Sequence, residues 1–245
     1  MRLKSIPQFD SWEPQLLQSL LDTPDLRFLW AMQETSGTQA KDYSGNARHG
    51  TYDGITINQF APNRRINKSV LFDGINDRII TPLTCSVRGL GLLTLACTIE
   101  ILNTGTNREI YYESTDVISS GRLIFRIGVD RKISVLIRSK TSTQTLTTVS
   151  TVNVIPVGFC VLHATIDIAQ NIIKIYRNGI EITVTGVVNL ESAIIDDTAP
   201  AGINFGVNAA QTANWLSGRM AYFAQWSRVL TPTEILQHSK SGGFA

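Results

Sequence analysis

The sequence predicts an all-β fold in which two antiparallel sheets stack face to face, with a short helix near each end of the chain. Apolar residues recur at every second position in many short segments, which is the pattern of half-buried strands. Turn-forming residues separate these segments at short intervals. The chain has 245 residues, of which 43% are hydrophobic and 17% charged. It is apolar and long enough for one β-sandwich core, and too weakly charged for a disordered chain.

The first 25 residues differ from the rest of the chain. Asp10 or Ser11 can cap a short helix there, and Pro24 would end it. One face of this helix would carry a stripe of four leucines, Leu16, Leu17, Leu20 and Leu21. A helix this short is marginal alone, so it must dock, either on its own domain or on a partner. We therefore divide the chain into an N-terminal arm, residues 1–25, and a β-domain, residues 26–245.

From Leu26 onward the hydrophobic period changes to two. In residues 93–101 every second side chain is apolar, and residues 123–129, 133–137, 160–166 and 220–226 repeat this pattern. Asn178-Gly179 stands between two such segments and predicts a hairpin, because a type I′ turn needs positive φ at both central residues. The threonine-rich stretch 141–151 predicts an exposed or edge strand.

A second short helix is predicted near the C-terminus. Thr231 can cap it, Pro232 fits its first position and Glu234 completes a capping box. Gly242 and Gly243 would end it. Many short strands with only two short helices exclude a wound α/β fold.

Charge and cysteine content limit the function classes. The 22 basic and 20 acidic residues are scattered, the formal net charge is +2, and no basic stripe indicates nucleic-acid binding. No window approaches 18 consecutive apolar residues, so we expect no membrane insertion. The N-terminus lacks the apolar core of a secretory signal. Cys85, Cys97 and Cys160 are widely spaced and odd in number, which favours buried free thiols and a reducing cytoplasm over disulfides or a zinc site.

Several short segments occur in a recognisable order. They are Asp42-Tyr43-Ser44-Gly45-Asn46, then Phe72-Asp73-Gly74, then Tyr176-Arg177-Asn178-Gly179, and finally Leu230-Thr231 with Glu234-Ile235. Over about residues 26–240 this order resembles the laminin G-like domains of the concanavalin A-like lectin/glucanase superfamily. The resemblance implies a jelly roll of two curved antiparallel sheets. It implies little about function, because this fold carries lectins, glycanases, adhesion modules and virion proteins.

The carboxylates that glycanases of this superfamily use are not found in the sequence. Those enzymes carry a Glu-x-Asp-x-x-Glu strand whose carboxylates converge on one cleft, and this chain has no Glu-x-Asp. Glu100 lies on a predicted strand but Leu102 follows it, and we expect Glu113 and Asp116 in a turn-like stretch. The three histidines, His49, His163 and His238, are far apart in sequence. We therefore expect the protein not to be an enzyme.

Calcium is the one cofactor that the resemblance suggests, since relatives often hold Ca²⁺ with loop oxygens. Candidate ligands of this type are Asp42, Asn46, Asp73, Asn76 and Asp77. The carboxylates that many relatives have in the last strand are missing here. The alternative is that the acidic and amide side chains only form turns, through hydrogen bonds to the nearby backbone. The expected cofactor is thus none, or calcium.

The tryptophans suggest where a ligand would bind. Trp30 and Trp226 lie on alternating strands and are expected in the core. Trp215 lies in a polar loop with Asn208 and Asn214 and is the better candidate for an exposed aromatic side chain. Trp215, Asn208 and Asn214 are therefore the predicted ligand-binding residues.

These observations favour a binding or structural module. One hypothesis is a virion protein of a tailed bacteriophage, localised in the virion as a capsid-decoration or tail-associated protein. Its partners would be other virion proteins or further copies of itself, reached through the N-terminal arm, and a host-surface glycan. The alternative is a free carbohydrate-binding lectin module. A glycoside hydrolase is the least favoured hypothesis.

Overall fold

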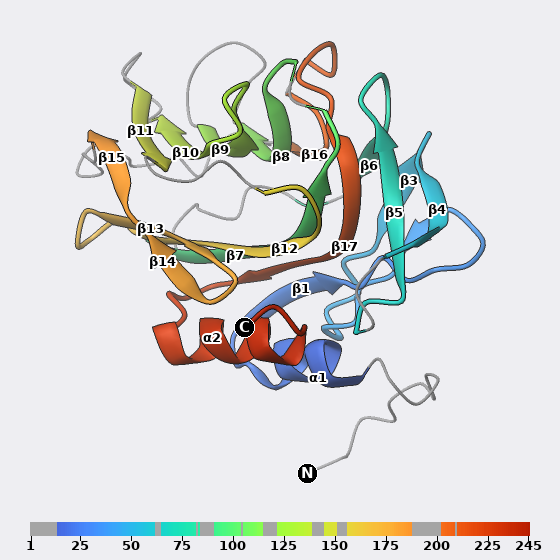
Figure 1. Cartoon of the computed structure of the whole chain (residues 1–245), viewed down its shortest axis with the longest axis horizontal. Coiled ribbons are helices and arrows are strands. Elements are labelled where there is room, and N and C mark those ends of the chain that lie inside the picture. The colour runs from blue at the N-terminus through green and yellow to red at the C-terminus, as the bar shows by residue number, and fades with distance from the viewer. Residues whose placement is uncertain are drawn as a thin grey trace.

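A computed structural model describes residues 14–61, 65–81, 83, 91–103, 105–114, 122–138, 145–150, 156–187, 202–208 and 210–245. Within them the chain forms two antiparallel sheets, stacked on each other, and two short helices (Figure 1). The architecture is a β-sandwich of the jelly-roll kind, which confirms the predicted fold class.

Sheet A contains eight strands. They are β1 (Leu26–Trp30), β4 (Thr56–Phe60), β5 (Lys68–Asp73), β7 (Leu92–Ile101), β12 (Cys160–Asp167), β13 (Ile172–Arg177), β14 (Ile180–Ile182) and β17 (Ser217–Trp226). Their order across the sheet is β14-β13-β12-β7-β17-β5-β4, and β1 also pairs with β17. Between β13 and β14, Asn178 and Gly179 have φ of 51° and 82°, which confirms the predicted hairpin turn.

Sheet B contains nine strands in the order β15-β11-β10-β9-β8-β16-β6-β3-β2. They are β2 (Gln39–Ala40), β3 (Gly50–Asp53), β6 (Arg78–Ile80), β8 (Arg108–Ser114), β9 (Arg122–Ile127), β10 (Ile133–Arg138), β11 (Thr145–Ser150), β15 (Val184–Val187) and β16 (Gly202–Phe205). The threonine-rich β11 pairs with β10 on one side and β15 on the other. It is therefore not an edge strand, because β15, which lies farther along the chain, pairs with its second side.

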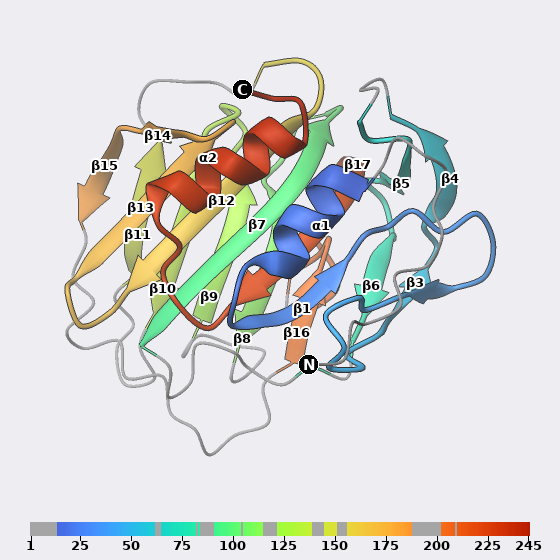
Figure 2. The same cartoon turned by 90° about the horizontal axis from the view of Figure 1, so that it is seen from below.

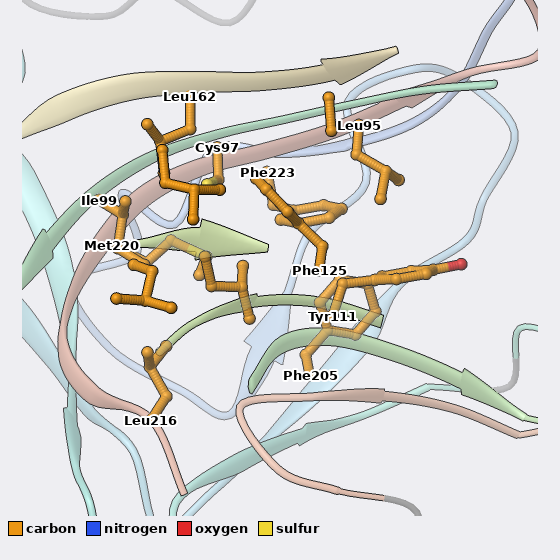
Figure 3. Packing of buried hydrophobic residues seen from close by; sticks show 14 of the residues in the cluster. Leu95, Cys97, Ile99, Tyr111, Phe125, Leu162, Phe205, Leu216, Met220 and Phe223 are labelled. Atoms are coloured by element: carbon orange, nitrogen blue, oxygen red, sulfur yellow. The ribbon is translucent and has the colours of Figure 1, made fainter. Parts of the chain in front are cut away.

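The core lies between the two sheets and is rich in aromatic rings. Figure 3 shows Phe205, Tyr111 and Phe125 of sheet B directed toward Phe223 of sheet A. The Phe205 ring meets those of Trp30, Phe223 and Tyr111 edge to face, with centroid distances of 4.6, 4.8 and 5.2 Å. All of these side chains are buried. The predicted core position of Trp30 is confirmed.

Both helices lie across the outer face of sheet A (Figure 2). They are α1 (Pro14–Asp22) and α2 (Pro232–Ser241). Their apolar sides form a second buried cluster with the outward-facing side chains of sheet A, including Leu16, Leu17, Leu20, Trp226 and Ile235. Three leucines of the predicted stripe, Leu16, Leu17 and Leu20, therefore dock on the chain's own domain, and Leu21 packs against them partly buried. The predicted caps Asp10 and Ser11 lie outside the described residues.

The α2 helix begins as the sequence predicts. The Thr231 side chain accepts a hydrogen bond from the Glu234 backbone N–H, the Glu234 carboxylate accepts one from the Thr231 N–H, and Pro232 occupies the first turn. No helix among the described residues is long and apolar enough to cross a membrane.

Cys97 and Cys160 are buried free thiols, as predicted, and burial raises the pKa of both. Cys85 lies outside the described residues.

Candidate ligand-binding site

The predicted ligand-binding residues lie between β16 and β17. The Asn208 side-chain oxygen accepts hydrogen bonds from the backbone N–H groups of Thr212 and Ala213, at 3.1 and 3.3 Å, so this amide closes its own loop. Trp215 is partly buried. Asn214 reaches another element, because its Nδ2 donates to Oε1 of Glu109 on β8 at 3.0 Å. The structure thus connects one of the three predicted residues to a charged group that sequence reasoning missed.

Glu109 is a carboxyl with unmet hydrogen-bonding capacity. It lies opposite Arg126 in the β8–β9 register and is only 1% exposed. Its Oε1 accepts from Asn214 and lies 3.9 Å from Nη1 of Arg126, whereas its Oε2 is buried without a hydrogen-bond partner. Burial raises the pKa of Glu109 to about 7, against the lowering effect of Arg126, Asn214 and Arg122.

Strand β9 supplies the positive charge beside Glu109. Leu123, Phe125 and Ile127 point into the core, so alternation directs Arg122 and Arg126 to the outer face of sheet B. The Nε atoms of both arginines are buried and unpaired. The Arg122 guanidinium lies over the ring of Tyr112, 5.8 Å from its centroid.

These five residues, Glu109, Tyr112, Arg122, Arg126 and Asn214, form what we call the Glu109 cluster. It offers N–H donors, one carboxyl and one aromatic ring on the outer face of sheet B. The helices cover the outer face of sheet A, on the other side of the sandwich. Unpaired buried donors and acceptors are rare in folded proteins, because each costs about 1–3 kcal/mol. A polar ligand that supplied the missing partners would recover part of that free energy.

The other acid of β8 does not join this cluster. Glu113 pairs in register with Leu123, whose side chain is in the core, and a bulge between Glu109 and Tyr111 shifts the alternation. Glu113 is fully buried and accepts a 2.6 Å hydrogen bond from the Tyr111 hydroxyl. The expectation of a turn at Glu113 was wrong, because cross-strand pairing makes it part of a strand. Asp116 lies outside the described residues.

Glu100, the remaining strand carboxylate considered above, lies on sheet A. It is on β7, as expected, and pairs with Arg219 at 2.8 Å. In the described part of the chain, no group of three or more His, Cys, Asp or Glu side chains is arranged to hold a metal ion.

The candidate calcium ligands Asp42 and Asn46 hold one turn against β1. The Asp42 carboxylate accepts hydrogen bonds from the backbone N–H groups of Leu29, Ser44 and Arg48, and from the Ser44 hydroxyl. The Asn46 amide donates to the carbonyls of Leu26 and Arg27.

Asp73 and Asp77 occupy a different turn, between β5 and β6. Asp73 accepts from the N–H groups of Ile75 and Asn76, and Asp77 accepts from the N–H of Asp73 at 2.7 Å. Four of the five candidate calcium ligands, Asp42, Asn46, Asp73 and Asp77, therefore form turns by hydrogen bonds to the backbone. Calcium binding by them stays a prediction, which thermal unfolding with and without Ca²⁺ would test.

Two histidines that are distant in sequence meet under the helices. His163 Nε2 lies 3.2 Å from His238 Nδ1, and His238 Nε2 lies 2.9 Å from the Thr23 hydroxyl. That hydroxyl donates to the Ser19 carbonyl, so it accepts from His238, and His163 must then donate to His238. Burial lowers the pKa of His238 to about 4 and holds that of His163 well below its usual value. This pair is a neutral packing element at the α1–α2 junction.

Comparisons with known proteins show the fold. No protein-family model and no curated protein matches the chain. Domain 4 of AbnA, a GH43 arabinanase of Geobacillus stearothermophilus, solved with arabinotriose, aligns at TM-score 0.64 and 18% identity, over 88% of this chain and 98% of that one. The binding domain of Paraclostridial Mosquitocidal Protein 1 aligns with a TM-score of 0.65 and 17% sequence identity, over 91% of this chain and 53% of that chain. Trypanosoma rangeli sialidase aligns at 0.61 and 13% over 89% of this chain, which spans about a third of the sialidase.

Proposed function

We propose that this chain is a non-catalytic binding module of lectin-like fold, that its ligand is a carbohydrate, and that the Glu109 cluster is the contact site. The single observation that carries the proposal is the set of unpaired polar atoms in this cluster, Glu109 Oε2 and the Nε groups of Arg122 and Arg126. Sugars present many hydroxyl groups, each able to donate and accept, so they suit a site that lacks both kinds of partner.

The structural neighbours support a binding role. The domain of AbnA that aligns over nearly its whole length was solved in complex with arabinotriose, and two neighbours are binding domains of toxins. Similar folds carry different functions, so the support from these proteins is for the class of function and not for a particular sugar.

The absence of catalysis is part of the proposal. A glycosidase needs two carboxyl groups that face the same bond, about 5–9.5 Å apart. On β8, Glu109 points to the outer face of sheet B and Glu113 is buried next to Tyr111, so these two cannot act on one substrate. We expect no turnover of any glycan that the protein binds.

A glycan array tests the function. We expect the folded protein to bind a restricted set of glycans, and Arg126→Gln to lose binding while remaining folded. Trp215→Ala in parallel decides whether the loop between β16 and β17 contributes. A folded wild-type protein that binds no glycan would overturn the proposal, and release of sugar products would replace it by an enzymatic function.

A virion role is a narrower version of the same proposal. It rests on the sequence resemblance to laminin G-like domains, a fold that virion proteins use, and on the buried thiols of Cys97 and Cys160, which suit assembly in a reducing cytoplasm. Mass spectrometry of purified bacteriophage particles tests it. Its failure would leave the binding module as a free lectin.

A further inference from the structure

We infer that the Glu109 cluster binds the carboxylate of an acidic sugar, and that binding tightens when Glu109 takes up a proton. This inference rests on the proposed carbohydrate-binding function and goes further, because it names the class of sugar and a condition that regulates its binding.

The charge of the cluster favours an anionic ligand. Arg122 and Arg126 bring two guanidinium groups to the outer face of sheet B, against the single carboxyl of Glu109. That carboxyl is 3.9 Å from Arg126, longer than a charge-assisted hydrogen bond. The cluster therefore keeps a net positive charge, which a neutral sugar would not compensate.

The unpaired atoms favour a carboxylate among anionic groups. A guanidinium binds a carboxylate through two parallel N–H···O bonds, and the Nε–H is one of the donors used when the carboxylate approaches from the side. The Nε groups of Arg122 and Arg126 are unpaired. Tyr112 lies under the Arg122 guanidinium and orients its plane. Arg126 keeps about a quarter of its side chain exposed, so a ligand can reach part of the side chain from solvent, and the guanidinium must shift before its buried Nε can donate.

Glu109 makes this binding depend on pH. When ionised, its carboxylate repels the incoming one and competes for Arg126. When protonated, it no longer repels the ligand or competes with it for Arg126, so Glu109 acts on the ligand through its charge while its own carboxyl stays buried. Binding is then accompanied by proton uptake, about half a proton at pH 7 and nearly one at pH 8, because Glu109 has a pKa of about 7.

The groups around Glu109 set the pH range. Burial raises the pKa of Glu109 to about 7. In the described part of the chain the charges acting on it come from Arg126 and Arg122 of β9, and the neutral Asn214 amide approaches from the segment before β17. The protonated fraction then rises from about one tenth at pH 8 to about nine tenths at pH 6, so we expect affinity to rise about tenfold.

The test uses pairs of glycans that differ only in charge. The intact protein is applied at pH 6 and pH 8 to an array of oligogalacturonates with their methyl esters, and of sialylated glycans with their asialo forms. The most strongly bound pair is then measured by titration calorimetry. We expect the acidic member to bind at least about tenfold more tightly than the neutral one at pH 6, and only its binding to weaken at pH 8.

Three variants assign the effect to residues. Glu109→Gln keeps the shape and stays uncharged, so we expect it to bind at pH 8 about as tightly as the wild type binds at pH 6. Arg126→Gln should lose about tenfold to a hundredfold in affinity for the acidic sugar. The matched control is Arg219→Gln, since Arg219 also has an unpaired buried Nε but lies on sheet A beside Glu100. It should bind like the wild type.

The outcomes separate this inference from the proposed function. Equal binding of acidic and neutral members, preference for the neutral ones, or affinity that does not change with pH would overturn the inference and leave a carbohydrate-binding module. Loss of binding by Arg219→Gln as large as that of Arg126→Gln would also overturn it. No binding to any glycan would remove the proposed function itself.

Discussion

The outer faces of the two sheets use polar side chains in opposite ways. On sheet A, the helices α1 and α2 cover the face, and the chain from Thr23 through His238 to His163 has a donor for nearly every acceptor. On sheet B, neither of the two helices in the described part of the chain covers the Glu109 cluster, which keeps a carboxyl oxygen and two guanidinium Nε groups without partners. The polar groups from Thr23 to His163 are thus nearly all paired by their own chain, whereas the Glu109 cluster lacks partners for three atoms; on sheet A the Nε of Arg219 is also unpaired.

This difference teaches where to look for function in a β-sandwich. The single unpaired atom of the histidine pair is Nδ1 of His163, a lone pair on a neutral ring. The unpaired atoms of the Glu109 cluster belong to ionisable or charged groups, whose burial costs more. A protein most readily retains buried charged groups without partners where ligand binding lowers the free-energy cost of burying them.

The two faces also respond to pH with opposite sign. His238 has a pKa of about 4 in the folded protein, below its unfolded value near 6.5, so the folded state binds fewer protons and stability falls as pH falls below about 6.5. Glu109 has a folded pKa of about 7, above the ordinary value of 4.5. Here the folded state binds more protons, so stability falls as pH rises from about 4.5 to 7.

The largest expected effect is on the packing under the helices. Trp226 is fully buried, stacks on His238 at 5.4 Å between ring centroids, and donates to the Thr23 carbonyl. We expect Trp226→Ala to lower the free energy of unfolding by about 3–5 kcal/mol in urea titrations. Trp215→Ala, at a partly buried position, is the control and should lose less than about 2 kcal/mol. Equal losses would mean that the helix-covered face is not the more tightly packed region.

The next largest expected effect on stability comes from Glu109, on sheet B. Glu109→Gln removes the buried carboxylate, so we expect it to be more stable than the wild type by up to about 3 kcal/mol at pH 8 and no more stable at pH 4. Unfolding by urea at several pH values measures this. A variant that is destabilised equally at both pH values would show that the Glu109 carboxylate is satisfied in the folded protein.

The matching experiment on sheet A is His238→Gln. The amide can donate to Thr23 and accept from His163, as the imidazole does, but it does not take up a proton. The wild type should lose about 2 kcal/mol between pH 6.5 and pH 5 from this histidine, and the variant should lose less. Identical acid profiles for the two proteins would contradict a role of the histidine pair in acid sensitivity.

The smallest effect concerns the start of α2. Thr231→Ala removes the side chain that accepts from the Glu234 N–H, and we expect a loss of about 1 kcal/mol. Thr233→Ala, at an exposed position in the same turn, is the control and should be close to neutral. Faster hydrogen exchange of the first-turn amides of α2 in Thr231→Ala alone would locate the loss at the cap.

Much of the fold is predictable because its signals are local. Alternation of apolar residues predicts strands such as β7 and β12, Asn178-Gly179 predicts a hairpin, and Thr231 with Glu234 predicts the start of α2. Each depends on residues a few positions apart. The sequence analysis failed where neighbouring residues do not reveal the pairing: β11 is covered by the distant β15, and Glu113 belongs to β8, whose pairing with β9 has a bulge that breaks the alternation.

The candidate site shows the same limit. Alternation with Leu123 and Phe125 already directs Arg122 and Arg126 away from the core, so their face was predictable. Their neighbour was not, because Glu109 meets Arg126 only through the β8–β9 register, and a bulge beside Glu109 changes which face it occupies. Asn214 was predicted as a ligand-binding residue for its loop position, and its contact with Glu109, which lies 105 positions earlier in the sequence, depends on the fold.

By itself the sequence determined the class of fold, the N-terminal cap of α2, the core tryptophans and the lack of a Glu-x-Asp-x-x-Glu strand, since periodicity, turn chemistry and composition are properties of neighbouring residues. Only the tertiary structure decided which polar groups are left without partners. Whether a buried carboxyl or guanidinium is satisfied depends on side chains that strand register and helix docking bring to within a few ångströms. Those contacts paired most of the polar groups beneath α1 and α2, and left the Glu109 cluster on the outer face of sheet B with two unpaired donors and an unpaired acceptor.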